Sequence, residues 1–171
     1  MGFLTAIEQS GFCTWVRESG SMWAYPLILF LHTVGLGFVV GTCMVVDLRL
    51  LGYAPRIPLK PIERFFPYLW AGFWISAISG TILLAADATT KVISTIFYVK
   101  MAFIILGVCL IPTLRRSVLG DGSGRAGASA SMKGKIVAAI SLACWAGAIT
   151  AGRLQAYLGP VSGAAGLTNH F

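Results

Sequence analysis

Four long apolar stretches with few or no charged side chains constrain this chain more than any other feature of its sequence. Residues 19–46 contain 28 uncharged positions in a row and residues 65–86 contain 22, while residues 92–114 are apolar except at Lys100 and residues 136–152 are free of charge. A helix needs about 20 apolar residues to cross a hydrocarbon core of about 30 Å. The pattern predicts an all-α bundle of four transmembrane helices, at about residues 24–46, 65–86, 92–114 and 134–158.

The composition supports an integral membrane protein. Apolar residues make up 57% of the 171 residues and charged residues 11%, against about 25% charged residues in a typical soluble domain. This composition excludes a disordered chain, a nucleic-acid module and most soluble enzymes. The four spans leave no room for a second domain, so residues 1–171 are expected to form one integral membrane domain.

The residues before the first span predict an amphipathic helix that lies in the membrane interface. Leu4, Ile7, Phe12, Trp15 and Val16 recur at roughly helical spacing, which is typical of interfacial helices. We expect this helix at about residues 3–19. The segment lacks the basic start and short apolar core of a cleavable signal peptide.

The basic residues predict the orientation. Nine of them lie in the two connections that follow the first and third spans, and three lie near the opposite ends of the spans. The first group is Arg49, Arg56, Lys60, Arg64, Arg115, Arg116, Arg125, Lys133 and Lys135, and the second is Arg17, Lys91 and Arg153. The positive-inside rule then places both long connections in the cytoplasm and both termini in the periplasm. The first of these connections is rich in proline and is expected to be stiff. The second, at residues 120–131, is rich in glycine, serine and alanine and is expected to be flexible.

His32 is the most informative side chain, because it is the only histidine inside a span. Polar residues in a span are costly and often functional, so His32 is a candidate ligand of haem or of a metal. The alternative is that it only forms hydrogen bonds to a neighbouring helix. Tyr25 lies on the same helix face, and the pair Gly37 and Gly41 forms a GxxxG motif that predicts a separate packing face.

Lys100 is the second unusual residue, about 12 Å along the third span and therefore at a depth similar to that of His32. It either extends its ammonium group toward water or neutralises an anion such as a haem propionate. Arg153, near the outer end of the fourth span, is a candidate for the same role. Asp87 is expected to pair with Lys91 or Lys100.

Other side chains carry weaker expectations. Trp145 can line a cofactor pocket, although ordinary helix packing is favoured. Cys43 and Met44 are soft ligands that suit copper, but the four cysteines show no C-x-x-C spacing. Outside the spans, His170 is a solvated tail residue or, if the tail folds back, a second imidazole.

Asp47 and Arg49 follow the predicted end of the first span. Arg49 suits a cytoplasmic anchor, and Asp47 is expected to pair with Arg49 or Arg64, or to cap the next turn. These are structural roles at the boundary between membrane and water.

Several short motifs resemble those of a bacterial family of small four-helix inner-membrane proteins of unknown function. They are Trp23-x-Tyr25-Pro26, Leu31-His32-Thr33-Val34-Gly35, Asp47-Leu48-Arg49-Leu50-Leu51-Gly52, Ser79-Gly80 and Phe97-Tyr98-Val99-Lys100. The resemblance covers about residues 15–116, with a looser similarity to CopD-type copper-resistance proteins and haem-binding membrane bundles. It implies that His32, Asp47, Arg49 and Lys100 are signature positions, but it implies no activity.

These observations together predict a multi-pass subunit of a redox or metal-handling assembly in the bacterial inner membrane. We expect one haem b, or less favourably a quinone or copper, to be held near the outer face through His32. The expected partners are the lipid bilayer, other membrane subunits or a second copy, and a periplasmic redox or metal protein, whereas nucleic acid is not expected. Catalysis by the chain alone is not expected. The alternatives are an assembly subunit without a cofactor and a small metal or solute transporter.

Overall fold

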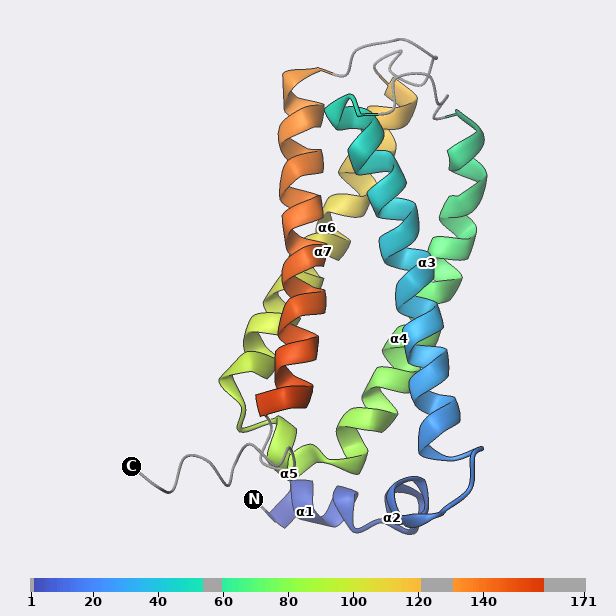
Figure 1. Ribbon diagram of the computed structural model, residues 1–171, viewed down its shortest axis with the longest axis vertical. Helices are drawn as coiled ribbons and strands as arrows, with labels where there is room; N and C mark the ends of the chain where they lie inside the picture. The colour runs from blue at the N-terminus through green and yellow to red at the C-terminus, as the bar shows by residue number, and fades with distance from the viewer. Residues whose placement is uncertain (1, 54–59, 121–130, 159–171) are drawn as a thin grey trace.

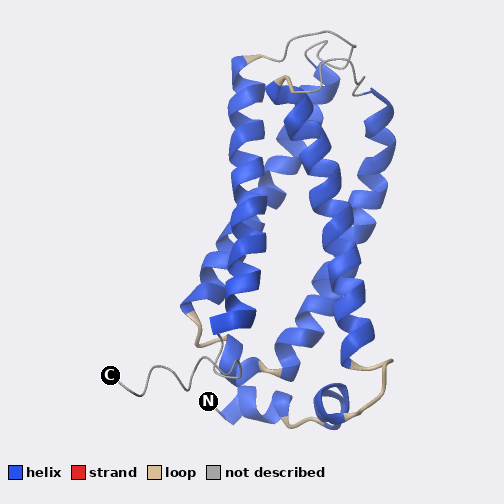
Figure 2. Cartoon of the chain, in the orientation of Figure 1, coloured by secondary structure: helices blue, strands red, loops and turns tan. Residues whose placement is uncertain are grey.

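The computed structural model is a bundle of four long helices with two short helices across one end (Figure 1). It describes residues 2–53, 60–120 and 131–158. The long helices are α3 (Tyr25–Leu51), α4 (Phe66–Ala86), α6 (Thr95–Gly120) and α7 (Met132–Leu158). Each is long and apolar enough to cross a membrane. The predicted all-α fold with four helices of membrane-spanning length is therefore confirmed, and no strand occurs in the described ranges (Figure 2).

Helix α3 continues past the predicted end of the first span at residue 46. Pro26 lies in its first turn, where a missing N–H leaves no hydrogen bond unmade. The helix ends at Gly52, whose φ of 97° is the left-handed conformation that favours glycine. Asp47 and Arg49 consequently lie within the helix, with 0% and 2% of their surfaces exposed. Both side chains are buried, because the neighbouring helices extend far enough to cover them; the expectation that they lie at the boundary between membrane and water stays a prediction.

The connections between the long helices are only partly described. The 3-10 helix η1 (Lys60–Phe65) leads into α4, and the short helix α5 (Ala88–Lys91) lies between α4 and α6. The expectations of a stiff first connection and a flexible second one concern residues 54–59 and 121–130, which lie outside the described residues.

The N-terminal segment forms two short helices rather than one. Helix α1 (Gly2–Glu8) ends before Ser10, and α2 (Gly11–Glu18) begins after it. Ser10 has an extended backbone, and its hydroxyl accepts a hydrogen bond from the Cys13 N–H at 3.5 Å. The single helix predicted for residues 3–19 is therefore wrong, because a serine before glycine caps a new helix instead of continuing the first. Both helices lie across one end of the bundle (Figure 1). We call this the outer end, following the distribution of basic residues, and the opposite end the inner end.

Glu8 attaches α1 to the turn after α4. Its Oε2 accepts hydrogen bonds from the Thr89 hydroxyl at 2.6 Å and from the Thr89 N–H at 3.1 Å. Its Oε1 pairs with Arg17 at 3.3 Å, and Arg17 also donates to the Ala86 carbonyl. The hydrogen bonds from Thr89 are the main cause that holds the pKa of Glu8 below its ordinary value. The apolar residues Cys13 and Val16 of α2 are buried, and α2 packs against α4.

Glycines bring the long helices together in two pairs. In the first pair, a Cβ added to Gly35 of α3 would lie 2.6 Å from the carbonyl oxygen of Gly72 in α4. In the second pair, Gly107 of α6 contacts the Trp145 ring, and Gly147 of α7 contacts Phe103. Small residues at these positions let helices approach closely in a membrane, where burial of apolar surface gives little driving force.

The GxxxG motif does not make the contact predicted for it within this chain. A Cβ added to Gly37 or Gly41 would meet nothing within 4 Å, and both residues are exposed. The covered glycine is Gly35, on the same side of α3 as His32.

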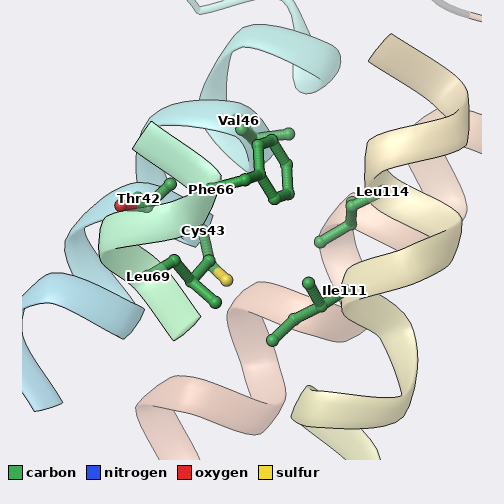
Figure 3. A pocket seen from close by; sticks show the side chains of 7 residues that line it. All are labelled: Thr42, Cys43, Val46, Phe66, Leu69, Ile111 and Leu114. Atoms are coloured by element: carbon green, nitrogen blue, oxygen red, sulfur yellow. The ribbon is translucent and has the colours of Figure 1, made fainter. Parts of the chain in front are cut away.

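The two pairs join through α3, which packs against α4, α6 and α7. The buried apolar clusters that hold them together lie along the inner half of α3, from Val39 to Leu50. Between α3, α4 and α6 this core leaves a small apolar hollow without room for a water molecule, lined in part by Cys43, Phe66 and Ile111 (Figure 3). Toward the outer end α3 diverges from α6 and α7 (Figure 1). The inner half is therefore the joint of the bundle.

The glycine contact gives a testable difference between two positions on one helix. Gly35→Ala should lower the free energy of unfolding by about 1–3 kcal/mol, because the added methyl group meets the backbone of α4. The matched control Gly37→Ala should not destabilise the protein, because its Cβ enters open space. Unfolding with dodecyl sulfate in mixed micelles measures both. Equal effects of the two substitutions would contradict the assignment of the packing face.

The attachment of α1 should depend on pH. Because folding lowers the pKa of Glu8, the stabilisation is present above the ordinary glutamate pKa and is lost as the pH falls through the lower, folded-state value. Glu8→Gln should remove it at neutral pH, seen as faster hydrogen exchange in α1. Glu18→Gln, which touches only the exposed pair with Arg17, is the control and should leave this exchange unchanged.

Candidate functional site

His32 lies in the outer half of the bundle, with its ring against α4. Nδ1 lies 2.9 Å from the Ser76 carbonyl oxygen, and 3.3 Å from each of the hydroxyls of Ser76 and Ser79. The ring is half-buried. These contacts tie α3 to α4 through polar groups, beside the backbone contact at Gly35.

The hydrogen bonds decide which ring nitrogen carries the proton. A carbonyl oxygen only accepts, so the contact with Ser76 requires a proton on Nδ1. The two hydroxyls donate elsewhere, because Ser79 donates to the Ile75 carbonyl at 2.6 Å and Ser76 to the His32 carbonyl at 3.3 Å. A neutral imidazole with a proton on Nδ1 has a free lone pair on Nε2.

Gly80 leaves space for this ring. A Cβ at that position would lie 2.9 Å from Cε1 and 3.2 Å from Nδ1 of His32, but 4.0 Å from Nε2. The Nδ1–Cε1 edge of the imidazole therefore faces α4, and Nε2 is farther from it. The Ser79-Gly80 sequence thus has a structural explanation, since a larger residue than glycine would displace the ring.

Lys100 belongs to the other helix pair. Its Nζ donates to Oε1 of Gln155 in α7 at 2.9 Å and lies 5.3 Å from the centre of the Phe97 ring. Phe97 is one turn nearer the outer end, so the ammonium group extends outward. His32 and Lys100 thus lie on different pairs in the same half of the bundle.

The remaining candidate residues do not join this site. Tyr25 is 38% exposed at the start of α3, and no described interaction connects it with His32. Arg153 is exposed, with its guanidinium over the Tyr157 ring and a hydrogen bond of 3.4 Å to its hydroxyl. Asp87 pairs with Lys91 at 3.0 Å, which is one of its two expected partners.

Trp145 is a core residue in the inner half. It is 3% exposed and packs in the same cluster as Cys43 and Ile111. Cys43 is 11 residues, or about 16 Å, along α3 from His32. Because Trp145 packs beside Cys43, it lies at a different depth from His32.

Two hollows lie in the inner half of the bundle, away from His32. The hollow beside Cys43 is too small for a cofactor, and a wider groove of about 870 Å³ lies at the inner end, between Arg64 and Arg115. In the part of the chain that the structure describes, no group of three or more His, Cys, Asp or Glu residues is placed to hold a metal ion. His170 lies outside the described residues.

Sequence reasoning missed the environment of Asp47. The carboxylate is fully buried between α3 and α7, and no ion pair joins it to Arg49 or Arg64 within the described ranges. The available signal was the position of an acid immediately after an apolar run, but only the covering helix α7 shows that it is buried.

Comparisons with protein families, with curated proteins and with solved structures find no match to this chain. The functional argument therefore depends on the geometry alone.

The proton on Nδ1 of His32 can be tested by nitrogen NMR. In protein with ¹⁵N-labelled histidine, at a pH about two units above the ordinary histidine pKa of about 6.5, His32 should show a protonated Nδ1 and an unprotonated Nε2. The His170→Ala variant assigns the signals of the two histidines. A proton on Nε2 would contradict the hydrogen-bond assignment.

Proposed function

We propose that the chain is a multi-pass subunit of a redox assembly in the bacterial inner membrane, and that it binds one haem b near the outer end through Nε2 of His32. The observation that carries this proposal is the hydrogen bond from Nδ1 to the Ser76 carbonyl. Histidines that bind metals commonly donate their other ring N–H to a carbonyl or carboxylate, which sets the tautomer and the direction of the ring.

The residues around His32 fit such a role. The Ser76 carbonyl orients the imidazole, and Gly80 leaves room for it. Lys100 supplies a positive charge in the same half of the membrane, which suits the carboxylates of a haem. When bound, haem b supplies one-electron transfer.

The second axial ligand must come from elsewhere. The described residues contain one histidine, so a second imidazole would belong to His170, to a second copy or to another subunit. The half-buried ring of His32 supports a haem held between this chain and a neighbour. A quinone is the alternative ligand, because an unprotonated Nε2 can accept a hydrogen bond from a quinol hydroxyl.

An assembly subunit without a cofactor is the second candidate function. It is favoured by the observation that the polar contacts of His32 all go to α4, beside the close approach of Gly35 and Gly72. On this account the imidazole only holds two helices together.

The two functions predict different results for His32→Ala. If His32 binds haem, the wild-type protein purified from cells supplied with haem should contain haem in the pyridine haemochrome assay. The His32→Ala variant should then lose most of this haem. Thr33→Ala is the matched control, because the Thr33 hydroxyl bonds only to Leu29 of its own helix. If the role is structural, His32→Ala should lower the stability by about 1–3 kcal/mol with no change in haem content. Absence of haem from the wild-type protein, alone and with its copurified partners, would contradict the first function.

A further inference from the structure

The joint between the two helix pairs contains a group of buried polar side chains. Asp47 of α3 and Ser141 of α7 are both 0% exposed, and Trp145 of α7 is 3% exposed. Cys43 and Asp47 are four residues apart on α3, and Ser141 and Trp145 are four apart on α7. Each pair therefore lies on one side of its helix, one turn apart, and the two helices pack together.

These side chains are not satisfied by their surroundings. Neither carboxylate oxygen of Asp47 has a hydrogen-bond partner in the described part of the chain, and the same holds for Oγ of Ser141 and Nε1 of Trp145. Ser141 is close enough to act on the carboxyl group, but it is not in hydrogen-bond geometry with it. An ionised carboxylate in such a place would be very unfavourable, because buried charges need a partner.

The nearby charged groups do not supply that partner. Arg49 follows Asp47 by two residues, so the two side chains leave α3 about 200° apart around the helix axis, on nearly opposite sides. Glu63 of η1 pairs with Arg115 of α6 at 3.6 Å. The charged or titratable groups with described side chains on the elements around this end of α3 are Cys43, Arg49, Glu63, Arg64, Arg115, Arg116, Lys133, Lys135 and Cys144. None of them forms an ion pair with Asp47 in the described ranges.

We propose that Asp47 is a proton-binding site, which holds a proton as a carboxylic acid between the two helix pairs. A proton from water at the inner end of the bundle forms an O–H bond with one carboxylate oxygen, and the charge of the group changes from −1 to zero. No electron is transferred. The acid can then donate one hydrogen bond through its O–H and accept others at its carbonyl oxygen, and the hydroxyl of Ser141 is the neighbouring group that can take part in either.

The position of Asp47 suits exchange of this proton with one side of the membrane. It lies four residues, or about 6 Å, from the end of α3, and 15 residues, or about 22 Å, from His32. The proton site is therefore separate from the proposed haem ligand and does not depend on it. Ionisable residues that face the interior of a membrane bundle commonly serve as proton carriers.

Infrared spectroscopy tests the proposal without a change at Asp47. The chain has three aspartates, Asp47, Asp87 and Asp121. In a double variant with Asp87→Asn and Asp121→Asn, Asp47 is the sole aspartate. At neutral pH the infrared spectrum should contain the C=O band of a protonated carboxylic acid. Labelling the side-chain carboxyl of aspartate with ¹³C should shift this band, which assigns it to Asp47.

Two single variants complete the experiment. Asp47→Asn should remove the band and leave the thermal stability within a few degrees of wild type, because it replaces a neutral acid by a neutral amide of the same shape. The matched control Asp87→Asn, at an exposed ion pair with Lys91, should keep the band. Absence of a protonated aspartate at neutral pH in the double variant would overturn the proposal. A large loss of stability in Asp47→Asn, with only ionised aspartate bands in the wild type, would show a charged Asp47 paired with Arg49 or a bound cation, and would also overturn it.

Discussion

The close approach of the α3 and α4 backbones at Gly35 and Gly72 is the constraint on which the outer half of the structure depends. With glycine at both positions, the two helices lie near enough for the imidazole of His32 to reach the Ser76 carbonyl. That hydrogen bond sets the tautomer, and the tautomer leaves Nε2 free. A packing contact between two glycines therefore determines which atom of His32 is available to a ligand.

Helix α3 connects two polar regions at different depths. His32 lies in the outer half, and Asp47 lies in the inner half, where the two helix pairs are joined. The apolar clusters that include Val39 and Leu50 lie along the inner half, whereas the ring of His32 is only half-buried. The buried acid is instead enclosed by α7. This division supports a ligand-binding role for the first region and a proton-binding role for the second.

Much of the fold could be predicted from the sequence, since charge-free stretches of about 20 residues have few alternatives to membrane-spanning helices. The choice of packing face could not, because the spacing of Gly37 and Gly41 shows only that they share a face, and not that another helix covers it. The apolar run before Asp47 predicts where the span ends, but it does not show that α3 continues to Gly52 or that α7 covers the carboxyl group. His32 could be identified as unusual, but Ser76 and Gly80 became part of its site only through the pairing of α3 with α4.

The central claim is that Nε2 of His32 is a ligand atom in a redox assembly. The most direct test is to extract the protein from its native membranes with a mild detergent, keeping its partners, and to record the reduced-minus-oxidised absorption spectrum. The account predicts the bands of a b-type haem that copurify with the wild-type chain and are missing when His32→Ala replaces it in the same membranes. A colourless complex, or the same spectrum from both proteins, would contradict the account.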